Sequence, residues 1–341
     1  MGGATGFVFA VFAFGGWGVI SALIGLAVGQ DAPMRGLERL NAEVGLVQKL
    51  VKTDLSKSFL DGAAKLKPIG ERVLWYNKDT QKFFTDAEYE RLTPESRKGF
   101  VSRVYDETFY YNTAYGSPTV YALPFEQAAK FGFTSWKGKK VVDFGYGMIG
   151  QLQMMAHAGA EVHGVDVMPI FTKLYSWPGD TGKMGSGSVS VHTGQWPKDR
   201  KMIDSVGRGV DLFVAKNVLK MGYIHPKRET NPAQLIDLGV PDQVFLKSLA
   251  GVMKPGGLVV IYNLSPAQAP ADQPYLPWAD GEYPFDWGVT KLAGFEILAR
   301  DIKDDAAARA LFLSLGYDNG SGLAGLEADL FTHVTVLRRT K

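Results

Sequence analysis

The sequence predicts an α/β fold built on a doubly wound, mostly parallel sheet. From Lys139 onward, short apolar runs alternate with stretches of helical composition, a pattern typical of parallel strands that are joined by helices and buried on both faces. The first run leads directly into a glycine-rich turn, and such sheets bind ligands at the carboxyl ends of their strands. The expected strands are KVVDFG, AEVHGVDV, SVSVHTG, VDLFVAKN, GGLVVIYN, FEILARD and FTHVTVLRR.

The composition limits the possible functions. The chain has 341 residues, with 37 Lys and Arg against 35 Asp and Glu, and its formal net charge is +2. This near balance, without a long basic run, gives no indication of nucleic-acid binding. The absence of cysteine excludes disulfides, thiolate metal sites and a cysteine nucleophile. The five histidines lack the spacing of a metal-binding pair, so we expect no metal site.

The N-terminal segment, residues 1–30, differs from the rest. No residue in the run 7–28 is charged, and as a helix this run would span roughly 33 Å, about the thickness of a bilayer core. Arg35 and Arg39 follow closely, which favours a retained membrane anchor with the remaining chain in the cytoplasm. Small residues before Gln30 leave open a signal peptide that is cleaved on export. A buried core helix is disfavoured because the run is apolar on every face.

Residues 31–137 are predicted to form a mostly helical lead-in. Apolar residues recur in steps of three and four from Leu37 to Val51, which indicates one stripe of a helix. Aromatic residues then crowd the stretch ETFYYNTAYGSPTVYALP. Tyr115 in this stretch is a candidate to roof a substrate pocket, although an aromatic cluster is equally explained as core. The sheet is expected within residues 138–341.

A glycine turn follows the first strand. Gly145, Gly147 and Gly150 have the GxGxxG spacing of a dinucleotide fingerprint, and glycine lets the backbone approach a ligand closely. Asp143, just before the turn, would set a negative charge near a pyrophosphate. It suits a ligand that carries an ammonium group instead.

With these motifs the sequence resembles the class I S-adenosylmethionine-dependent methyltransferases over about residues 138–341. In that family the first strand ends in an acid before a glycine-rich turn, as in VVDFGYG, and the second strand ends in an acid, as Asp166 does in VHGVDV. A fourth strand that opens with an acid, as in VDLFVAK with Asp211, and a KPGG turn before the fifth strand are also similar. The resemblance implies a Rossmann-like sheet of seven strands with an antiparallel last strand.

The resemblance also implies S-adenosylmethionine as the cofactor. Asp143 and Asp166 would bind its amino-acid and ribose ends, and Asp211 would be structural. The family's third glycine often falls at the position of Ile149, whereas here it is Gly150. The cofactor-binding candidates are Asp143, Gly145, Tyr146, Gly147, Asp166, Val167, Gln195, Trp196 and Asn217.

Gln195 and Trp196 stand where the family often has an acid that reads the adenine amine. The amide of Gln195 is expected to replace that acid, and the Trp196 ring to lie against the base. A strand-end carboxylate such as Asp166 has an alternative role, because it can simply cap the helix that follows.

The acceptor side is expected in two loops, after the fourth and the fifth strand. His225 is a candidate general base and Tyr223 a second catalytic candidate, although a lone His before Pro often only bonds within its loop. The loop after the fifth strand is long and rich in proline, and such a loop is frequently a lid or a passive surface segment. The substrate-binding candidates are Lys220, Asn263, Trp278, Asp280 and Tyr115.

Three functions remain open from the sequence. The first is methyl transfer from S-adenosylmethionine to a small-molecule or lipid-like acceptor by in-line displacement. The second is a nicotinamide-binding oxidoreductase, favoured by the glycine spacing and disfavoured by Asp143. The third is a non-catalytic protein that uses the same fold as an interaction platform.

Overall fold

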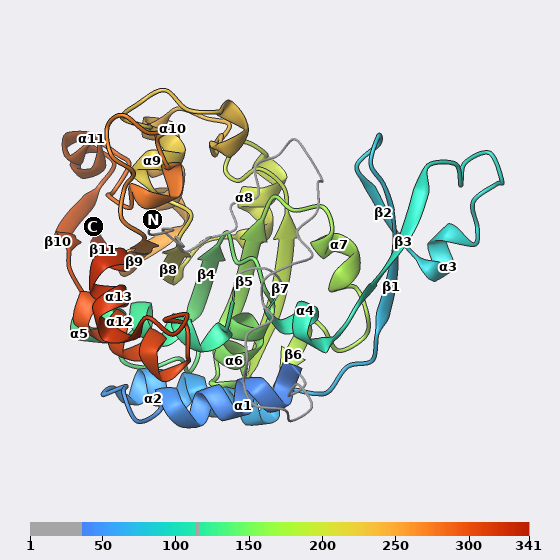
Figure 1. Cartoon of the computed structure of the whole chain (residues 1–341), viewed down its shortest axis with the longest axis horizontal. Coiled ribbons are helices and arrows are strands. Elements are labelled where there is room, and N and C mark those ends of the chain that lie inside the picture. The colour runs from blue at the N-terminus through green and yellow to red at the C-terminus, as the bar shows by residue number, and fades with distance from the viewer. Residues whose placement is uncertain (1–35, 113–115, 341) are drawn as a thin grey trace, which may run out of the picture.

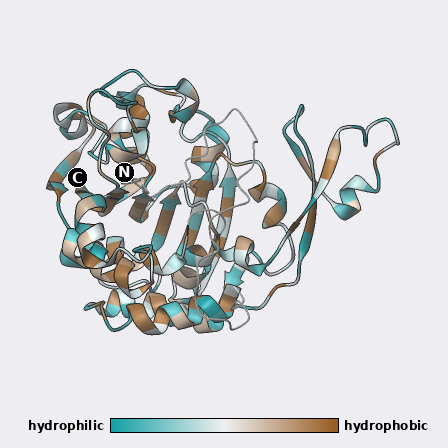
Figure 2. Cartoon of the chain, viewed as in Figure 1, coloured by the Kyte–Doolittle hydropathy of each residue, from teal (hydrophilic) through white to brown (hydrophobic). Residues whose placement is uncertain are grey.

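The structure is a computed structural model and describes residues 36–112 and 116–340. A large mixed sheet forms the centre, helices cover both of its faces, and a small second sheet projects from one side (Figure 1). Hydrophobic segments recur along the strands of the main sheet, and the loop between α3 and β3 is largely hydrophilic (Figure 2).

The main sheet has eight strands in the order β10-β11-β9-β8-β4-β5-β7-β6. The strands from β9 across to β7 run parallel, and β11 is antiparallel to both of its neighbours. The predicted antiparallel last strand is therefore confirmed. The strands are β4 (Lys140–Phe144), β5 (Glu161–Asp166), β6 (Gly182–Met184), β7 (Gly187–Thr193), β8 (Val210–Lys216), β9 (Met253–Ser265), β10 (Phe295–Ile302) and β11 (Phe331–Arg339).

The prediction of seven strands was one strand short. Residues Gly182–Met184 form β6, which pairs antiparallel with β7 at the edge of the sheet. The turn between them contains Gly185 at a φ of 58°, a left-handed conformation that glycine adopts without strain. The strand has only three residues in a glycine-rich stretch, so it lacks the apolar alternation by which a strand is recognised.

Helices cover the sheet in two layers with separate hydrophobic cores. One face packs on helices from both the lead-in and the methyltransferase-like region, namely α1 (Gly36–Val47), α2 (Asp54–Asp61), α5 (Ala122–Lys130), α6 (Gly150–His157), α7 (Phe171–Leu174), α12 (Asp305–Ser314) and α13 (Gly322–Asp329). The other face packs on α8 (Arg200–Val206), α10 (Asp242–Val252) and α11 (Trp287–Leu292). Residues on both sides of the predicted boundary at residue 137 thus share one core.

The remaining elements are short and lie in connections. They are η1 (Gly62–Lys65), α3 (Asp86–Tyr89), α4 (Glu107–Asn112), η2 (Pro118–Tyr121), α9 (Met221–Ile224), η3 (Pro232–Gln234) and η4 (Pro277–Ala279). Side-chain caps fix several helix starts: Thr53 accepts a hydrogen bond from the Ser56 amide at the start of α2, and Asp286 accepts one from the Val289 amide at the start of α11.

The lead-in is helical at its two ends, but its middle forms a sheet that the prediction of a mostly helical region did not include. The strands β1 (Arg72–Asn77), β2 (Lys82–Thr85) and β3 (Phe100–Tyr105) pair antiparallel in the order β2-β1-β3. Leu74 and Tyr76 are buried on one face, whereas Trp75 points the other way and stacks on Tyr89 at 3.6 Å between ring centroids. Buried and partly exposed residues alternate along most of β1, which is the period of a half-buried pleated strand. The described part of the aromatic stretch 107–124 belongs instead to α4, η2 and the start of α5.

A buried ion pair ties the root of the small sheet to the main body. The Arg72 guanidinium donates to both carboxylate oxygens of Asp180, at 2.7 and 2.8 Å. The Tyr110 hydroxyl also donates to this carboxylate at 2.8 Å. A bidentate pair of this kind fixes orientation as well as distance.

The predicted membrane segment, residues 7–28, lies outside the described residues. Within 36–112 and 116–340, no helix is both long and apolar enough to cross a bilayer. The anchor and the signal peptide both remain predictions from the sequence.

Candidate functional site

The glycine turn joins β4 to α6 at the carboxyl edge of the parallel strands. Gly145 and Gly147 have φ values of 70° and 61°, which only glycine adopts without strain. A Cβ on Gly145 would overlap the side chain of Val218, which follows β8. Glycine is required at this position for close packing of the next loop as well as for the turn itself.

Asp143, at the end of β4, is fully buried. Its Oδ1 accepts a hydrogen bond from the Tyr121 hydroxyl at 3.1 Å, and its Oδ2 accepts one from Gln151 Nε2 at 2.9 Å. Burial raises the pKa of Asp143 to about 7. The carboxylate therefore lies behind the turn, where it connects the lead-in to α6 instead of presenting a surface to a ligand's amino-acid end.

Asp166, at the end of β5, holds the glycine turn from the side. Its Oδ2 accepts from the Gly147 amide and its Oδ1 from the Met168 amide, both at 3.0 Å. Burial raises the pKa of Asp166. The Val167 amide also donates to this carboxylate, which leaves part of its acceptor capacity unused, and 8% of the residue is exposed. Asp166 can thus accept hydroxyl hydrogen bonds beside the turn, next to the exposed Val167.

Tyr146, between the two glycines of the turn, points inward. Its ring packs against Phe171 and Tyr175, and it fills the space above Gly164, where a Cβ would meet it. Its buried hydroxyl has no hydrogen-bond partner among the described residues. The side chain therefore supports the turn from within the core.

The two adenine candidates follow β7, beside Asp166, and their side chains make contacts within the protein. Trp196 is 3% exposed and packs among Phe144, Phe213 and Phe245, with ring centroids 5.4–5.9 Å away. Gln195 donates from Nε2 to the Asp237 carbonyl at 2.8 Å. In the described arrangement, Trp196 belongs to the core of the second face and Gln195 fastens a loop.

The loop after β8 lies at the same edge, as predicted. Asn217 has a φ of 64°, and its Oδ1 accepts from the Leu264 amide at 2.7 Å, so this candidate bridges β8 and β9. Lys220 is 2% exposed. Its Nζ donates to the carbonyls of Leu264 and Trp278, and burial lowers the pKa of Lys220 to about 7.

The catalytic candidates differ in exposure. Tyr223 is 8% exposed, and burial raises its pKa above the usual value. The His225 side chain is 47% exposed, and its Nε2 donates to Asp242 Oδ2 at 2.8 Å. This contact joins the end of α9 to the start of α10. In the structure, His225 therefore makes a hydrogen bond between neighbouring segments, which is the alternative to a catalytic role.

The two predicted acceptor loops touch each other. The amides of Met221 and Gly222 donate to the carbonyls of Glu282 and Asp280, at 2.8 and 3.1 Å. Asn263, 1% exposed, donates to the Leu219 and Gly281 carbonyls at 2.8 Å.

Two further acceptor candidates contribute in different ways. Asp280 accepts from the Tyr275 hydroxyl at 2.8 Å, and Trp278 contributes its carbonyl to Lys220. Tyr115 lies outside the described residues.

Lys216 is a buried charge that the sequence prediction missed. It is the last residue of β8 and is 8% exposed. The signal was present, because a lysine that closes the apolar run VDLFVA must either leave the sheet or be buried at the carboxyl edge. The sequence analysis considered only the acceptor candidates that follow Lys216 and did not consider Lys216 itself.

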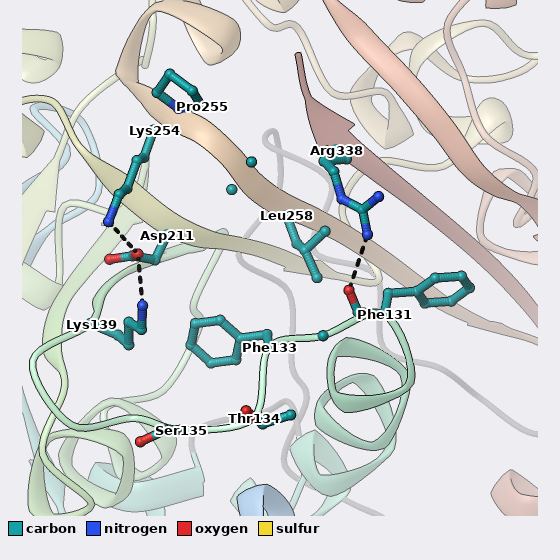
Figure 3. Close-up of a pocket in the computed structure, with 13 residues that line it drawn as sticks. Phe131, Phe133, Thr134, Ser135, Lys139, Asp211, Lys254, Pro255, Leu258 and Arg338 are labelled. Atoms are coloured by element: carbon teal, nitrogen blue, oxygen red, sulfur yellow. Dashed lines mark hydrogen bonds and ion pairs between the residues drawn. The ribbon is translucent and has the colours of Figure 1, made fainter. Parts of the chain in front are cut away.

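A cavity lies at the other end of the sheet. It has a volume of about 450 Å³ and opens near the amino ends of β8 and β9 (Figure 3). Asp211 lies there between the ammonium groups of Lys139 and Lys254, at 3.2 and 3.4 Å. In this position Asp211 does not contact the glycine turn, so its expected structural role stays a prediction. The cavity is remote from the glycine turn, because parallel strands separate their amino and carboxyl ends.

Comparison with known proteins gives likeness in fold only. No family model matches the chain, and no curated protein matches it in sequence. A phosphoethanolamine N-methyltransferase of Haemonchus contortus is 12% identical with a TM-score of 0.39, over 84% of this chain and 74% of that one. Magnesium protoporphyrin IX methyltransferase of Synechocystis is 16% identical with a TM-score of 0.32, over 65% and 78%. The [4+2]-cyclase SpnF is 14% identical with a TM-score of 0.35, over 90% and 96%.

At these values the likeness carries no argument about activity. The class of fold follows from the sheet itself: the seven predicted strands form one sheet, the glycine turn follows its first strand, and the last strand is antiparallel. The chain thus has the class I S-adenosylmethionine-dependent methyltransferase fold.

Proposed function

We propose that this protein binds S-adenosylmethionine at the carboxyl edge of the sheet and transfers its methyl group to a small-molecule or lipid-like acceptor. The observation that carries the proposal is Asp166, whose carboxylate lies against the glycine turn and keeps acceptor capacity beyond its bonds to backbone amides. A ribose hydroxyl is a suitable donor for this remaining capacity.

The residues present fit the cofactor in part. Asp166 would hold the ribose, and the backbone of Gly145–Gly147 would border the ligand. Asp143, enclosed by Tyr121 and Gln151, would position this backbone instead of touching the ligand. The cofactor supplies an activated methyl group, so the chain mainly has to align the acceptor and exclude water.

The touching loops after β8 and β9 support an acceptor site beside the turn. They follow neighbouring parallel strands, whose carboxyl ends meet at one edge, and Val218 already contacts Gly145. The fold alone does not fix the reaction, because one similar structure is a cyclase by its name. Turnover therefore has to be tested separately from binding.

Calorimetric titration of the full chain tests the binding. S-adenosylmethionine and S-adenosylhomocysteine should bind, and NAD should not. Asp166→Ala should weaken binding by about 1.5–3 kcal/mol, the range for a hydrogen bond to a charged group. Asp211→Ala, at the amino edge, is the matched control and should bind as the parent does. Equal affinity in Asp166→Ala would remove the ribose assignment.

Transfer of a labelled methyl group to membrane and soluble extracts tests the activity. Labelled product that disappears in Gly147→Val supports an enzyme, because a valine side chain would fill the cofactor side of the turn. Cofactor binding without any labelled product favours the non-catalytic alternative.

The proposed activity favours the membrane-anchor interpretation of residues 1–30. The donor is a cytoplasmic metabolite, and a domain exported behind a signal peptide would be separated from it. A reporter that fluoresces only in the cytoplasm, fused after Lys341, should be bright. A dark reporter on a chain whose mature N-terminus lies near Gln30 would contradict the anchor.

A further inference from the structure

Lys216 is a largely buried lysine whose ammonium group has no hydrogen-bond acceptor among the described residues. Its side chain is on the same face of the sheet as Asp143, because Asp143 pairs with Val214 and alternate residues of a strand share a face. Its Nζ lies 5.1 Å from the centroid of the Tyr121 ring. It donates no hydrogen bond to any residue in 36–112 or 116–340, although only 8% of the residue is exposed.

The carboxylate beside it does not satisfy it. Asp143 already accepts hydrogen bonds from Tyr121 and Gln151. Among the described residues, no ion pair within 4.0 Å joins it to Lys216. The two groups nevertheless lie within electrostatic range: burial lowers the pKa of Lys216 to about 8, and the charge of Asp143 opposes this effect.

Lys220, four residues further on, is a buried lysine that does have hydrogen-bond acceptors, and it serves as a comparison. It is 2% exposed, against 8% for Lys216, and its Nζ donates to the carbonyls of Leu264 and Trp278. The charge of Lys216 adds to the effect of burial in lowering the pKa of Lys220. The two ammonium groups therefore repel each other, and only one of them has acceptors.

A buried charge without hydrogen bonds is unfavourable unless a partner supplies them. A water molecule could accept a hydrogen bond from Nζ, but it would not balance the charge. An anionic oxygen does both. It would also relieve the repulsion between Lys216 and Lys220.

We infer that Lys216 binds an anionic oxygen of a ligand at the carboxyl edge of the sheet. This inference rests on the proposed function and specifies its chemistry. The oxygen belongs either to the carboxylate in the amino-acid part of the donor or to the acceptor. If the acceptor supplies the oxygen, a cationic amine is a poor acceptor here, because Lys216 would repel it.

If the anion is the acceptor, the transfer step is balanced without a further reagent. A lone pair on the carboxylate oxygen forms the new O–C bond while the S–C bond breaks. The electron pair of that bond stays on sulfur, so the sulfonium becomes a neutral thioether. A carboxylate acceptor releases no proton, so the step needs no general base.

The test compares Lys216→Met, which removes the ammonium and keeps the side-chain length, with Lys216→Arg, which keeps the charge. Lys139→Met at the amino edge is the matched control. Calorimetry of the full chain uses three probes: S-adenosylhomocysteine, 5′-methylthioadenosine, which lacks the amino-acid part, and benzoate. Circular dichroism checks folding, and Lys216→Gln replaces the Met variant if that variant is unfolded.

The probes distinguish the two sources of the anion. If the donor supplies the anionic oxygen, Lys216→Met should weaken the binding of S-adenosylhomocysteine by about tenfold or more. The affinity for 5′-methylthioadenosine should stay unchanged. If the acceptor supplies the anionic oxygen, the affinity for S-adenosylhomocysteine should be unaffected, and the affinity for benzoate should fall by about the same factor. Lys216→Arg should stay close to the parent for every probe.

The inference and the proposed function fail in different ways. A parent chain that binds neither adenosine probe contradicts the cofactor proposal, and benzoate alone then decides the role of Lys216. Benzoate that binds the parent and is lost in Lys216→Met supports that role. Unchanged affinity of the neutral variants for every probe that the parent binds, or a parent that binds none of the three, overturns the inference.

Discussion

Charged side chains are partly exposed at one end of the parallel sheet and buried at the other. At the amino edge, Asp211, Lys139 and Lys254 line an open cavity of about 450 Å³, and Lys139 and Lys254 are partly exposed and pair with Asp211 (Figure 3). At the carboxyl edge, Asp143 and Lys216 are buried. There the charges lie against protein groups instead of solvent.

This difference shows that an open cavity and a chemically prepared site need not coincide. Charges that pair with each other at a surface contribute little, and removing them should have small effects. Buried charges depend on each contact around them, and their pKa values are shifted for this reason. The comparison can be tested by equivalent substitutions at the two edges.

The largest difference is expected for glycine. Gly145 and Gly256 both have positive φ values, 70° and 81°, so alanine costs about 1–2 kcal/mol of backbone strain at either position. A Cβ on Gly145 also overlaps Val218, whereas a Cβ on Gly256 meets nothing within 4 Å. Gly145→Ala should therefore lower the free energy of unfolding by about 2–5 kcal/mol, since overpacking adds about 1–3 kcal/mol.

Urea denaturation of both variants measures this difference. Gly256→Ala should lose only the backbone component. Equal losses in the two variants would mean that the loop after β8 does not press against the turn in solution.

The second difference is expected for lysine. Lys220→Met leaves the buried carbonyls of Leu264 and Trp278 without their donor, which should cost about 2–3 kcal/mol of folding free energy. Lys254→Met at the amino edge removes a side chain that is 57% exposed, and it should cost less than about 1 kcal/mol. Thermal and urea unfolding of the two variants, side by side, provides the measurement. A loss in Lys220→Met no larger than in Lys254→Met would contradict the contrast between the edges.

The smallest difference concerns pH. Burial raises the pKa of Asp143 to about 7 in the folded protein, above the value of about 3.9 expected in the unfolded chain. The folded state therefore binds the proton more tightly between these values, and the free energy of unfolding falls as the pH rises from about 4 to about 7. Asp143→Asn removes this titration. Between about pH 5.5 and about pH 6.5, the parent should lose about 1 kcal/mol more than the variant.

The pH profiles of urea unfolding of the parent and of Asp143→Asn provide the measurement. If Asp143→Asn keeps the slope of the parent, a different group is responsible for the pH dependence.

The sequence was sufficient for most of the sheet because its signals are local. Each apolar run, the glycine turn and the acids at strand ends can be recognised within a few residues of one another. The small sheet around Trp75 and the strand β6 were missed for the same reason: one has aromatic residues on both faces, and the other is only three residues long.

The sequence by itself determined that Asp143 and Asp166 end neighbouring strands and that glycines follow the first of them. Only the tertiary structure decided that Tyr121 and Gln151 enclose Asp143, that Trp196 enters the core, and that Lys216 finds no acceptor among the described residues. The physical reason is that burial and hydrogen-bond partners depend on which distant segments pack together, and a strand pattern specifies only the face on which a side chain lies.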